Sequence, residues 1–114
     1  MRIKKVCQIL KGIADDTRLR TINLLQKHDL NVGELRRILG VSQSNLSKHL
    51  AKLRLTGIVS DRRRGPNVYY YLRKADNRAQ EELIKAIASG FSEIEVFKKD
   101  LLALKKVLKK GGKA

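Results

Sequence analysis

The stretch VGELRRILGVSQSNLSKHLAKLRLTG, residues 32–57, decides the fold because it joins two short helical patterns through a turn. The first pattern, residues 32–39, ends at Gly40, a residue type that favours the left-handed conformation just beyond a helix. Ser42 can then cap a second helix, and Gly57 ends it. The apolar positions of this second helix recur at helical spacing and are Leu46, Leu50 and Leu53. Two helices joined by so short a turn predict a helix-turn-helix unit.

The second of these helices contains no acidic residue. With its leucines facing inward, its outward face carries short polar groups in the first half and cations further along. Ser44 and Lys48 then point outward, and their flanks are formed by Asn45, Ser47 and Lys52. Short polar side chains let a helix approach base edges, and lysines reach phosphates or guanine. A solvated basic face is the simpler alternative, but from Arg36 to Lys74 there are ten basic residues and one acidic residue. We therefore expect double-stranded DNA as the partner.

The hydrophobic period changes in IVSDRRRGPNVYYYL, residues 58–72, which predicts a β-hairpin with its tip at Arg64–Asn67. Strand alternation places Val68, Tyr70 and Leu72 on one face, and Tyr69 and Tyr71 on the other. The hairpin tip is basic. Such a wing can contact a phosphate backbone or a minor groove through Arg62, Arg63, Arg64 and Asn67.

The remaining segments are predicted to be helical. Residues 2–13 form a short amphipathic helix, and Asp15 or Asp16 caps the next one. Residues 76–110 contain an apolar heptad seam, in which Gly90 either permits close helix approach or marks a break. We expect one domain over residues 1–110, mainly α with a small β-hairpin, in the order α-α-α-α-β-β-α, followed by a frayed tail at 111–114. The helix-turn-helix unit and its wing occupy 32–72 of it.

Composition limits the function classes. The chain has 114 residues, a formal net charge of +15 and a pI of about 10.4, which indicates an anionic partner, either nucleic acid or a membrane surface. Cys7 is the only cysteine, which is typical of a reducing compartment. No run of about 18 apolar residues and no secretory signal occur, so we expect a cytoplasmic protein that does not enter a membrane.

Three motifs together, ADDTRLRTINLL, LNVGELRRILGVSQSNLSKHLAKLRLTGIV and RRRGPNVYYYL, resemble the ArsR-type winged-helix repressors over about residues 10–72. Asp16 stands where many members have proline. The resemblance implies a homodimeric repressor of an inverted-repeat operator, with base reading by Gln43, Ser44, Asn45, Ser47 and Lys48. It also implies a dimer formed by the first and last helices, 2–13 and 76–110. This agrees with their apolar seams, from which we expect dimer contacts at Ile3, Val6, Leu10, Leu83, Ile87, Ile94, Phe97 and Leu101.

The signal that such a repressor answers to is not apparent from the residues. The Cys-Val-Cys metal site of some relatives is replaced by Asn31, Val32 and Gly33, and no histidine follows His49, so we expect neither usual metal site and no cofactor. His49 lies at the core boundary, where packing or a hydrogen bond that orients the helix is expected rather than base contact. Cys7 is either a small buried thiol that acts as a hydrophobic side chain or a redox-sensitive one.

Three other functions stay open. A non-specific architectural DNA-binding protein would also suit the charge, and a redox-responsive repressor would act through Cys7. The 76–110 segment could instead bind another protein or a membrane surface, although its heptad seam favours helix pairing. We find no spacing of nucleophile, base and acid that predicts an enzyme.

Overall fold

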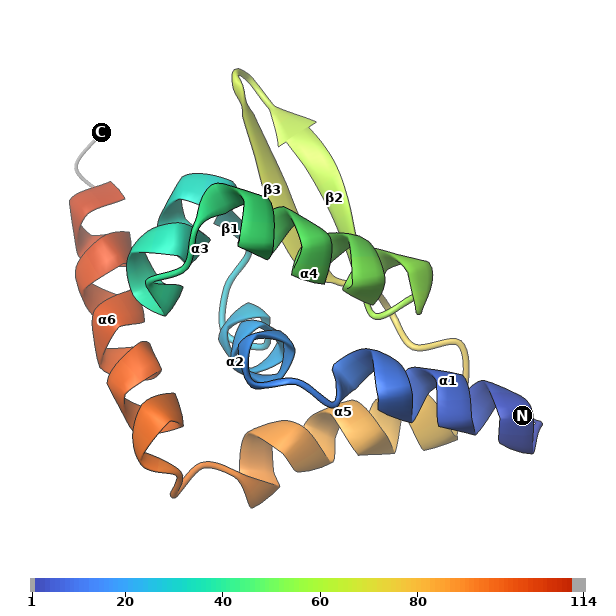
Figure 1. The fold of residues 1–114 in the computed structure, drawn as a ribbon. Coiled ribbons are helices and arrows are strands. Elements are labelled where there is room, and N and C mark those ends of the chain that lie inside the picture. The colour runs from blue at the N-terminus through green and yellow to red at the C-terminus, as the bar shows by residue number, and fades with distance from the viewer. Residues whose placement is uncertain (1, 112–114) are drawn as a thin grey trace.

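The computed structural model describes residues 2–111, which form six helices and a three-stranded sheet (Figure 1). The elements in chain order are α1 (Ile3–Ile13), α2 (Asp16–Leu25), β1 (Leu30–Asn31), α3 (Val32–Leu39), α4 (Gln43–Leu55), β2 (Val59–Arg64), β3 (Asn67–Leu72), α5 (Arg78–Gly90) and α6 (Glu95–Gly111). The predicted order of helices around a central hairpin is confirmed. Of the expected frayed tail, Gly111 belongs to α6, and 112–114 lie outside the described residues.

Side-chain caps begin α2 and both helices of the helix-turn-helix unit, α3 and α4. Asp15 accepts a hydrogen bond from the backbone amide three residues on, at 3.1 Å, and Ser42 does the same at 3.2 Å. Asn31 and Glu34 form a reciprocal capping box at the start of α3, with bonds of 2.8 and 2.9 Å. Gly40 ends α3 with φ of 70°, a conformation that costs glycine little. These local bonds explain why the sequence pattern located the helix boundaries closely.

The core surrounds α2, which packs against all five other helices and lies near the centre of the view in Figure 1. The inward leucines of α4 are essentially closed to solvent, with exposed fractions of 0%, 2% and 0% for Leu46, Leu50 and Leu53. They pack in one cluster with Ile22, Leu35 and other apolar residues. Because this cluster holds one face of α4, the opposite face of that helix is available to a partner.

The sheet has the strand order β1-β3-β2, and both pairs are antiparallel. The hairpin register pairs Arg64 with Asn67 and Val59 with Leu72, as the predicted tip requires. The third strand, β1, was not predicted, since two residues are too few to show an alternating pattern. It pairs Leu30 with Tyr70, and it thereby attaches the loop after α2 to the centre of the sheet.

The C-terminal segment is two helices rather than one. The helix is interrupted between Gly90 and Glu95, so the heptad seam does not form one continuous stripe. Glycine is a poor helix former. The break also lets Phe91 and Phe97 pack edge to face, with ring centroids 6.1 Å apart. Helix α5 then packs against α2, while α6 packs against both α2 and α3.

A buried ion pair anchors α6 to α2. Arg20 donates hydrogen bonds of 2.8 Å to both carboxylate oxygens of Asp100, whose side chain is 1% exposed. These hydrogen bonds raise the pKa of the Arg20 guanidinium above its ordinary value. The bidentate geometry fixes the position of α6 as well as satisfying the buried carboxylate.

Among residues 2–111, none of the helices combines the length and the apolar character that crossing a bilayer requires.

Candidate nucleic-acid interface

The outward face of α4 presents the side chains that the sequence predicted for base reading. All six of them are exposed: Gln43, Ser44, Asn45, Ser47, Lys48 and Lys52. The helix has no acidic residue in its first turn, so its positive N-terminal end adds to the charge of the lysines. The face therefore offers short donors and acceptors beside cations, a combination that suits base edges and phosphates.

His49 connects α4 to the start of α2. Its Nδ1 atom lies 3.2 Å from Arg18 Nη1 and 3.4 Å from Asp15 Oδ2, the same carboxylate group that caps α2. The imidazole is mostly buried, with 15% of the side chain exposed. These contacts agree with the interpretation of His49 as a residue that helps to orient the helix. Sequence reasoning did not identify Arg18 and Asp15 as its partners, because they precede it by about thirty residues.

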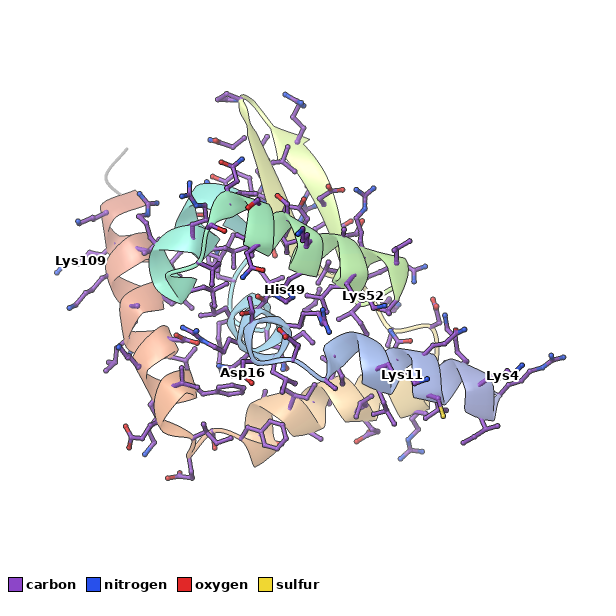
Figure 2. All side chains as sticks on the ribbon, in the orientation of Figure 1. Lys4, Lys11, Asp16, His49, Lys52 and Lys109 are labelled. Atoms are coloured by element: carbon purple, nitrogen blue, oxygen red, sulfur yellow. The ribbon has the colours of Figure 1, made fainter. Side chains whose placement is uncertain are left out.

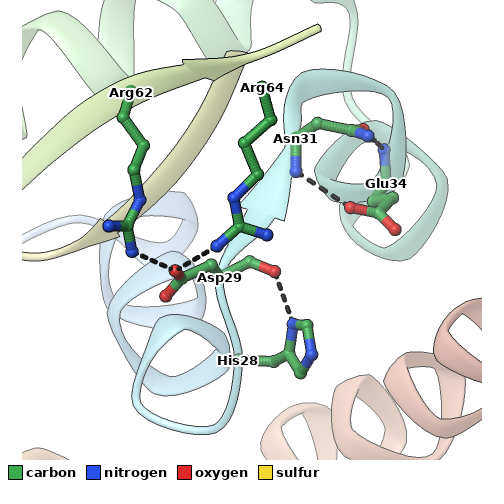
Figure 3. A network of polar contacts seen from close by, with 6 residues as sticks. All are labelled: His28, Asp29, Asn31, Glu34, Arg62 and Arg64. Carbon is green, nitrogen blue, oxygen red and sulfur yellow. Dashed lines mark hydrogen bonds and ion pairs between the residues drawn. The ribbon is translucent and has the colours of Figure 1, made fainter. Parts of the chain in front are cut away.

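The wing arginines are held by a residue that the sequence did not single out. Asp29 Oδ2 lies 2.9 Å from Arg62 Nη2 and 3.5 Å from Arg64 Nη2 (Figure 3). The same two guanidinium groups stack on tyrosine rings. Arg62 Cζ lies 4.8 Å from the ring centroid of Tyr71, and Arg64 Cζ lies 4.9 Å from that of Tyr69. Each guanidinium therefore lies over a tyrosine ring and also contacts the shared carboxylate.

The three wing arginines are consequently not equivalent, although the prediction treated them as one basic tip. Strand alternation puts Arg63 on the face opposite Arg62 and Arg64, and no ion pair to Arg63 occurs within the described part of the chain. On the same face as Arg63, Asp61 lies 3.4 Å from Arg54 at the end of α4. Arg63 is thus the wing arginine whose charge is available without breaking an ion pair. Asn67, on the opposite strand at the tip, is exposed.

Local hydrogen bonds surround the backbone of Asp29. It lies in the short connection between α2 and β1, where the preceding His28 ring contacts the Asp29 carbonyl at 2.6 Å. Two residues later the capping box of α3 begins, as Figure 3 shows. The pairing of β1 with β3 attaches this connection to the sheet, and Asp29 thereby meets Arg62 and Arg64 of the hairpin. The sequence signal for this contact was an acidic residue close to a basic region. Its arginine partners could not be identified from the sequence, because they depend on the pairing of β1 with β3.

The residues predicted for a dimer contact fall into three groups. Ile3, Leu10 and Ile94 are exposed, with exposed fractions of 76%, 44% and 46%. Val6, Leu83 and Leu101 are half-buried. The remaining two, Ile87 and Phe97, are only 3% and 4% exposed because they belong to the core of this chain. These two residues therefore have little surface left for a second chain.

Cys7 lies exposed on α1, beside the apolar residues of that helix. Within residues 2–111, no group of three or more histidine, cysteine, aspartate or glutamate side chains is arranged to hold a metal ion.

Residues 15–61, which run from the cap of α2 into β2, match the family model described as "Bacterial regulatory protein, arsR family". The chain is 40% identical over 80 residues to the transcriptional activator HlyU of Vibrio cholerae, an alignment that covers 70% of this chain and 74% of HlyU.

Solved structures of other proteins share the fold. The transcriptional repressor BigR from Xylella fastidiosa matches with a TM-score of 0.71 and 32% identity, over 81% of this chain and 88% of BigR. The homodimeric winged helix-turn-helix DNA-binding domain of a Mycobacterium bovis protein matches with a TM-score of 0.65 and 25% identity. That alignment covers 80% of this chain and 84% of the domain.

Proposed function

We propose, since this chain belongs to the arsR family of bacterial regulatory proteins, that it is a homodimeric repressor of transcription. In this proposal each protomer reads one half of an inverted repeat in duplex DNA, and the protein acts in the bacterial cytoplasm. The observation that carries the proposal is the outward face of α4, which is exposed, polar and free of acids while its leucines are buried.

Base reading is assigned to the N-terminal half of α4. Ser44 and Lys48 are one turn apart on the outward face, and Gln43, Asn45 and Ser47 surround them. Their side chains are short enough for close approach to a major groove, except for Lys48, which suits guanine or phosphate. The wing supplies contacts that hold the protein on the duplex but carry little sequence information. Arg63 is the wing arginine assigned to these phosphate contacts, because it has no ion pair within the described part of the chain.

The dimer is assigned to α1 and to the exposed part of the C-terminal segment. Ile3, Val6 and Leu10 recur at spacings of three and four on α1, and Ile3 and Leu10 are exposed large apolar residues. Ile94 lies in the break between α5 and α6 and is exposed as well. The homodimeric relative from Mycobacterium bovis supports this assembly.

We propose that the protein represses transcription, although the names of its relatives include both repressors and an activator. BigR is a transcriptional repressor, whereas HlyU is a transcriptional activator. A protein that covers its DNA site with a helix and a wing blocks polymerase by occupancy, without needing a second interaction surface. For this reason we assign repression.

The test compares specific with random DNA. A site selected from a random pool of duplexes should bind the protein at least about 10³-fold more tightly than random DNA of the same length. Lys48→Ala and Ser44→Ala should reduce that ratio, while Lys109→Ala on α6 serves as a control. Equal affinity for both duplexes at physiological salt would favour an architectural protein. A monomer in light scattering at micromolar concentration would contradict the dimer.

A further inference from the structure

Helix α1 has two different flanks. Its inner side is buried through Ile9 and Ile13. One flank carries the apolar residues assigned above to the dimer. The other flank is basic and polar, and its members recur at helical spacing: Lys4, Lys5, Gln8 and Lys11. No acidic residue occurs anywhere in α1. The basic flank is therefore distinct from the surface proposed to pair two protomers.

The basic flank borders a groove shared with the end of α4. Side chains of Lys5, Gln8, Ile9 and Lys11 line one wall, and those of Lys52, Leu55 and Thr56 line the other. The groove encloses about 330 Å³. At its base the two helices touch closely, since a Cβ atom added at Gly12 would overlap the methyl group of Thr56. The lysines of α1 are thus held at a fixed place beside α4.

The groove continues the outward face of α4. Lys48 and Lys52 are one turn apart, and Leu55 follows Ala51 on the same face with 84% of its surface exposed. Figure 2 shows Lys52 near the end of α4 and Lys11 on the neighbouring helix α1, with Lys4 further along. Lys109 of α6 lies on the opposite side of the molecule. A surface that includes the base-reading face therefore extends onto α1.

The charges along this surface are not neutralised. Within residues 2–111, none of Lys4, Lys5, Lys11, Lys48 and Lys52 has a carboxylate within 4.0 Å, whereas six other cations of the chain pair with acids on the surface: Arg54, Arg62, Arg64, Arg73, Lys85 and Lys98. Like charges in a row repel one another in the free protein. An anionic partner relieves this repulsion, and a duplex supplies regularly spaced phosphates.

We propose that the basic flank of α1, Lys4, Lys5 and Lys11, binds the phosphate backbone of DNA together with Lys52. The inference rests on the proposed function, because it takes DNA to be the partner of α4. The phosphates in question adjoin the groove that α4 enters. Their contacts strengthen binding to every sequence, since phosphates do not differ between base pairs.

The test uses the full chain with Lys5→Gln and Lys11→Gln combined. The matched control combines Lys105→Gln and Lys109→Gln on α6, which removes the same charge on the far side. Affinities for a pool-selected duplex and for a random duplex of equal length are measured between 50 and 400 mM salt. Removing one lysine that binds a phosphate lowers the slope of log affinity against log salt by about 0.9. The proposed dimer carries both substitutions in each protomer, so four phosphate contacts are removed and the slope falls by about 3.6. This corresponds to roughly a 900-fold weaker affinity at 0.15 M salt, by extrapolation from 1 M.

We expect the α1 variant to bind both duplexes more weakly by the same factor, with the ratio between them unchanged, while the α6 control keeps the original slope. Lys48→Ala separates the two proposals. If it lowers selectivity while the α1 variant keeps the original slope, the α1 proposal is wrong and the proposed function stands. If neither variant affects binding, the proposed function fails too. An α1 variant that no longer dimerises in light scattering would also overturn the α1 proposal. The α1 proposal would be overturned as well if the α1 variant bound DNA normally but no longer bound vesicles of phosphatidylglycerol and phosphatidylcholine.

Discussion

Replacing Gly12 by alanine tests how closely α1 and α4 are packed. A Cβ atom at this position would overlap Cγ2 of Thr56 and lie 3.1 and 3.2 Å from its Cβ and Oγ1 atoms. The threonine cannot easily turn away. Its hydroxyl donates to the backbone carbonyls of Lys52 and Leu53, at 3.1 and 3.0 Å, and these bonds favour its present rotamer. The substitution must therefore separate the helices or break these bonds.

The magnitude follows from two opposing effects. Overpacking of a well-filled contact costs about 1–3 kcal/mol. Alanine stabilises a helix relative to glycine by up to about 1 kcal/mol. Gly90→Ala isolates the second effect, because Gly90 is also helical and a Cβ atom there would meet no atom within 4 Å. We expect the Gly12 variant to be less stable than the Gly90 variant by about 1–3 kcal/mol, or roughly 4–12 °C in Tm for a chain of this size.

Thermal and urea unfolding of the two variants provide the measurement, and Thr56→Ser completes a double-mutant cycle. Serine keeps the hydroxyl and removes only the methyl group that alanine would strike. The stability that Gly12→Ala removes should be regained in the double variant, with a coupling energy of about 1 kcal/mol or more. If Gly12→Ala and Gly90→Ala raise Tm equally, or if the cycle shows no coupling, the close approach of α1 to α4 is refuted.

Three further perturbations have definite expected results. Asp100→Ala removes both hydrogen bonds from Arg20, whose side chain is 19% exposed and can turn to water, and should cost about 1.5–3 kcal/mol in urea unfolding; a loss below about 0.5 kcal/mol would show that the pair does not hold α6 as described. Leu50→Ala should cost about 2–5 kcal/mol because Leu50 is 2% exposed, while Leu55→Ala, at an 84% exposed site, should change the free energy of unfolding by less than about 0.5 kcal/mol. Asp29→Asn should release both wing arginines of each protomer to phosphates and steepen the salt dependence of random-DNA affinity by about 1.8 per protomer, or about 3.6 for the dimer; an unchanged slope would mean that the tyrosine rings alone hold them.

Much of the DNA-binding unit was predictable because its determinants are local. Helix caps such as Ser42 bond to amides three residues away, and the leucines of α4 repeat within one helix. The outward direction of Ser44 and Lys48 follows once those leucines face inward. The alternation of Tyr69, Tyr70 and Tyr71 could likewise be predicted from the strand period alone, and it agrees with the stacking of arginines on Tyr69 and Tyr71.

The C-terminal segment shows where local patterns lose their power. Leucine, isoleucine and phenylalanine at heptad spacing are consistent with a seam for a second chain and equally with a face for the core of the same chain. The turn after Gly90 directs Ile87 and Phe97 inward. The apolar seam is thereby divided between the core of this chain and the surface that remains for a second chain. Nothing within the segment specifies that outcome, since it depends on the space that α2 and α3 leave open.

The sequence by itself determined the first four helices and the hairpin, which face of α4 is polar, and that the chain carries a large positive charge. Only the tertiary structure decided that Asp29 holds two of the three wing arginines, that His49 meets Arg18, and that the lysines of α1 lie beside the end of α4. The physical reason is the range of the interactions. Caps and periodicity act within a few residues, whereas these contacts join residues far apart in the chain and exist only after the whole core has packed.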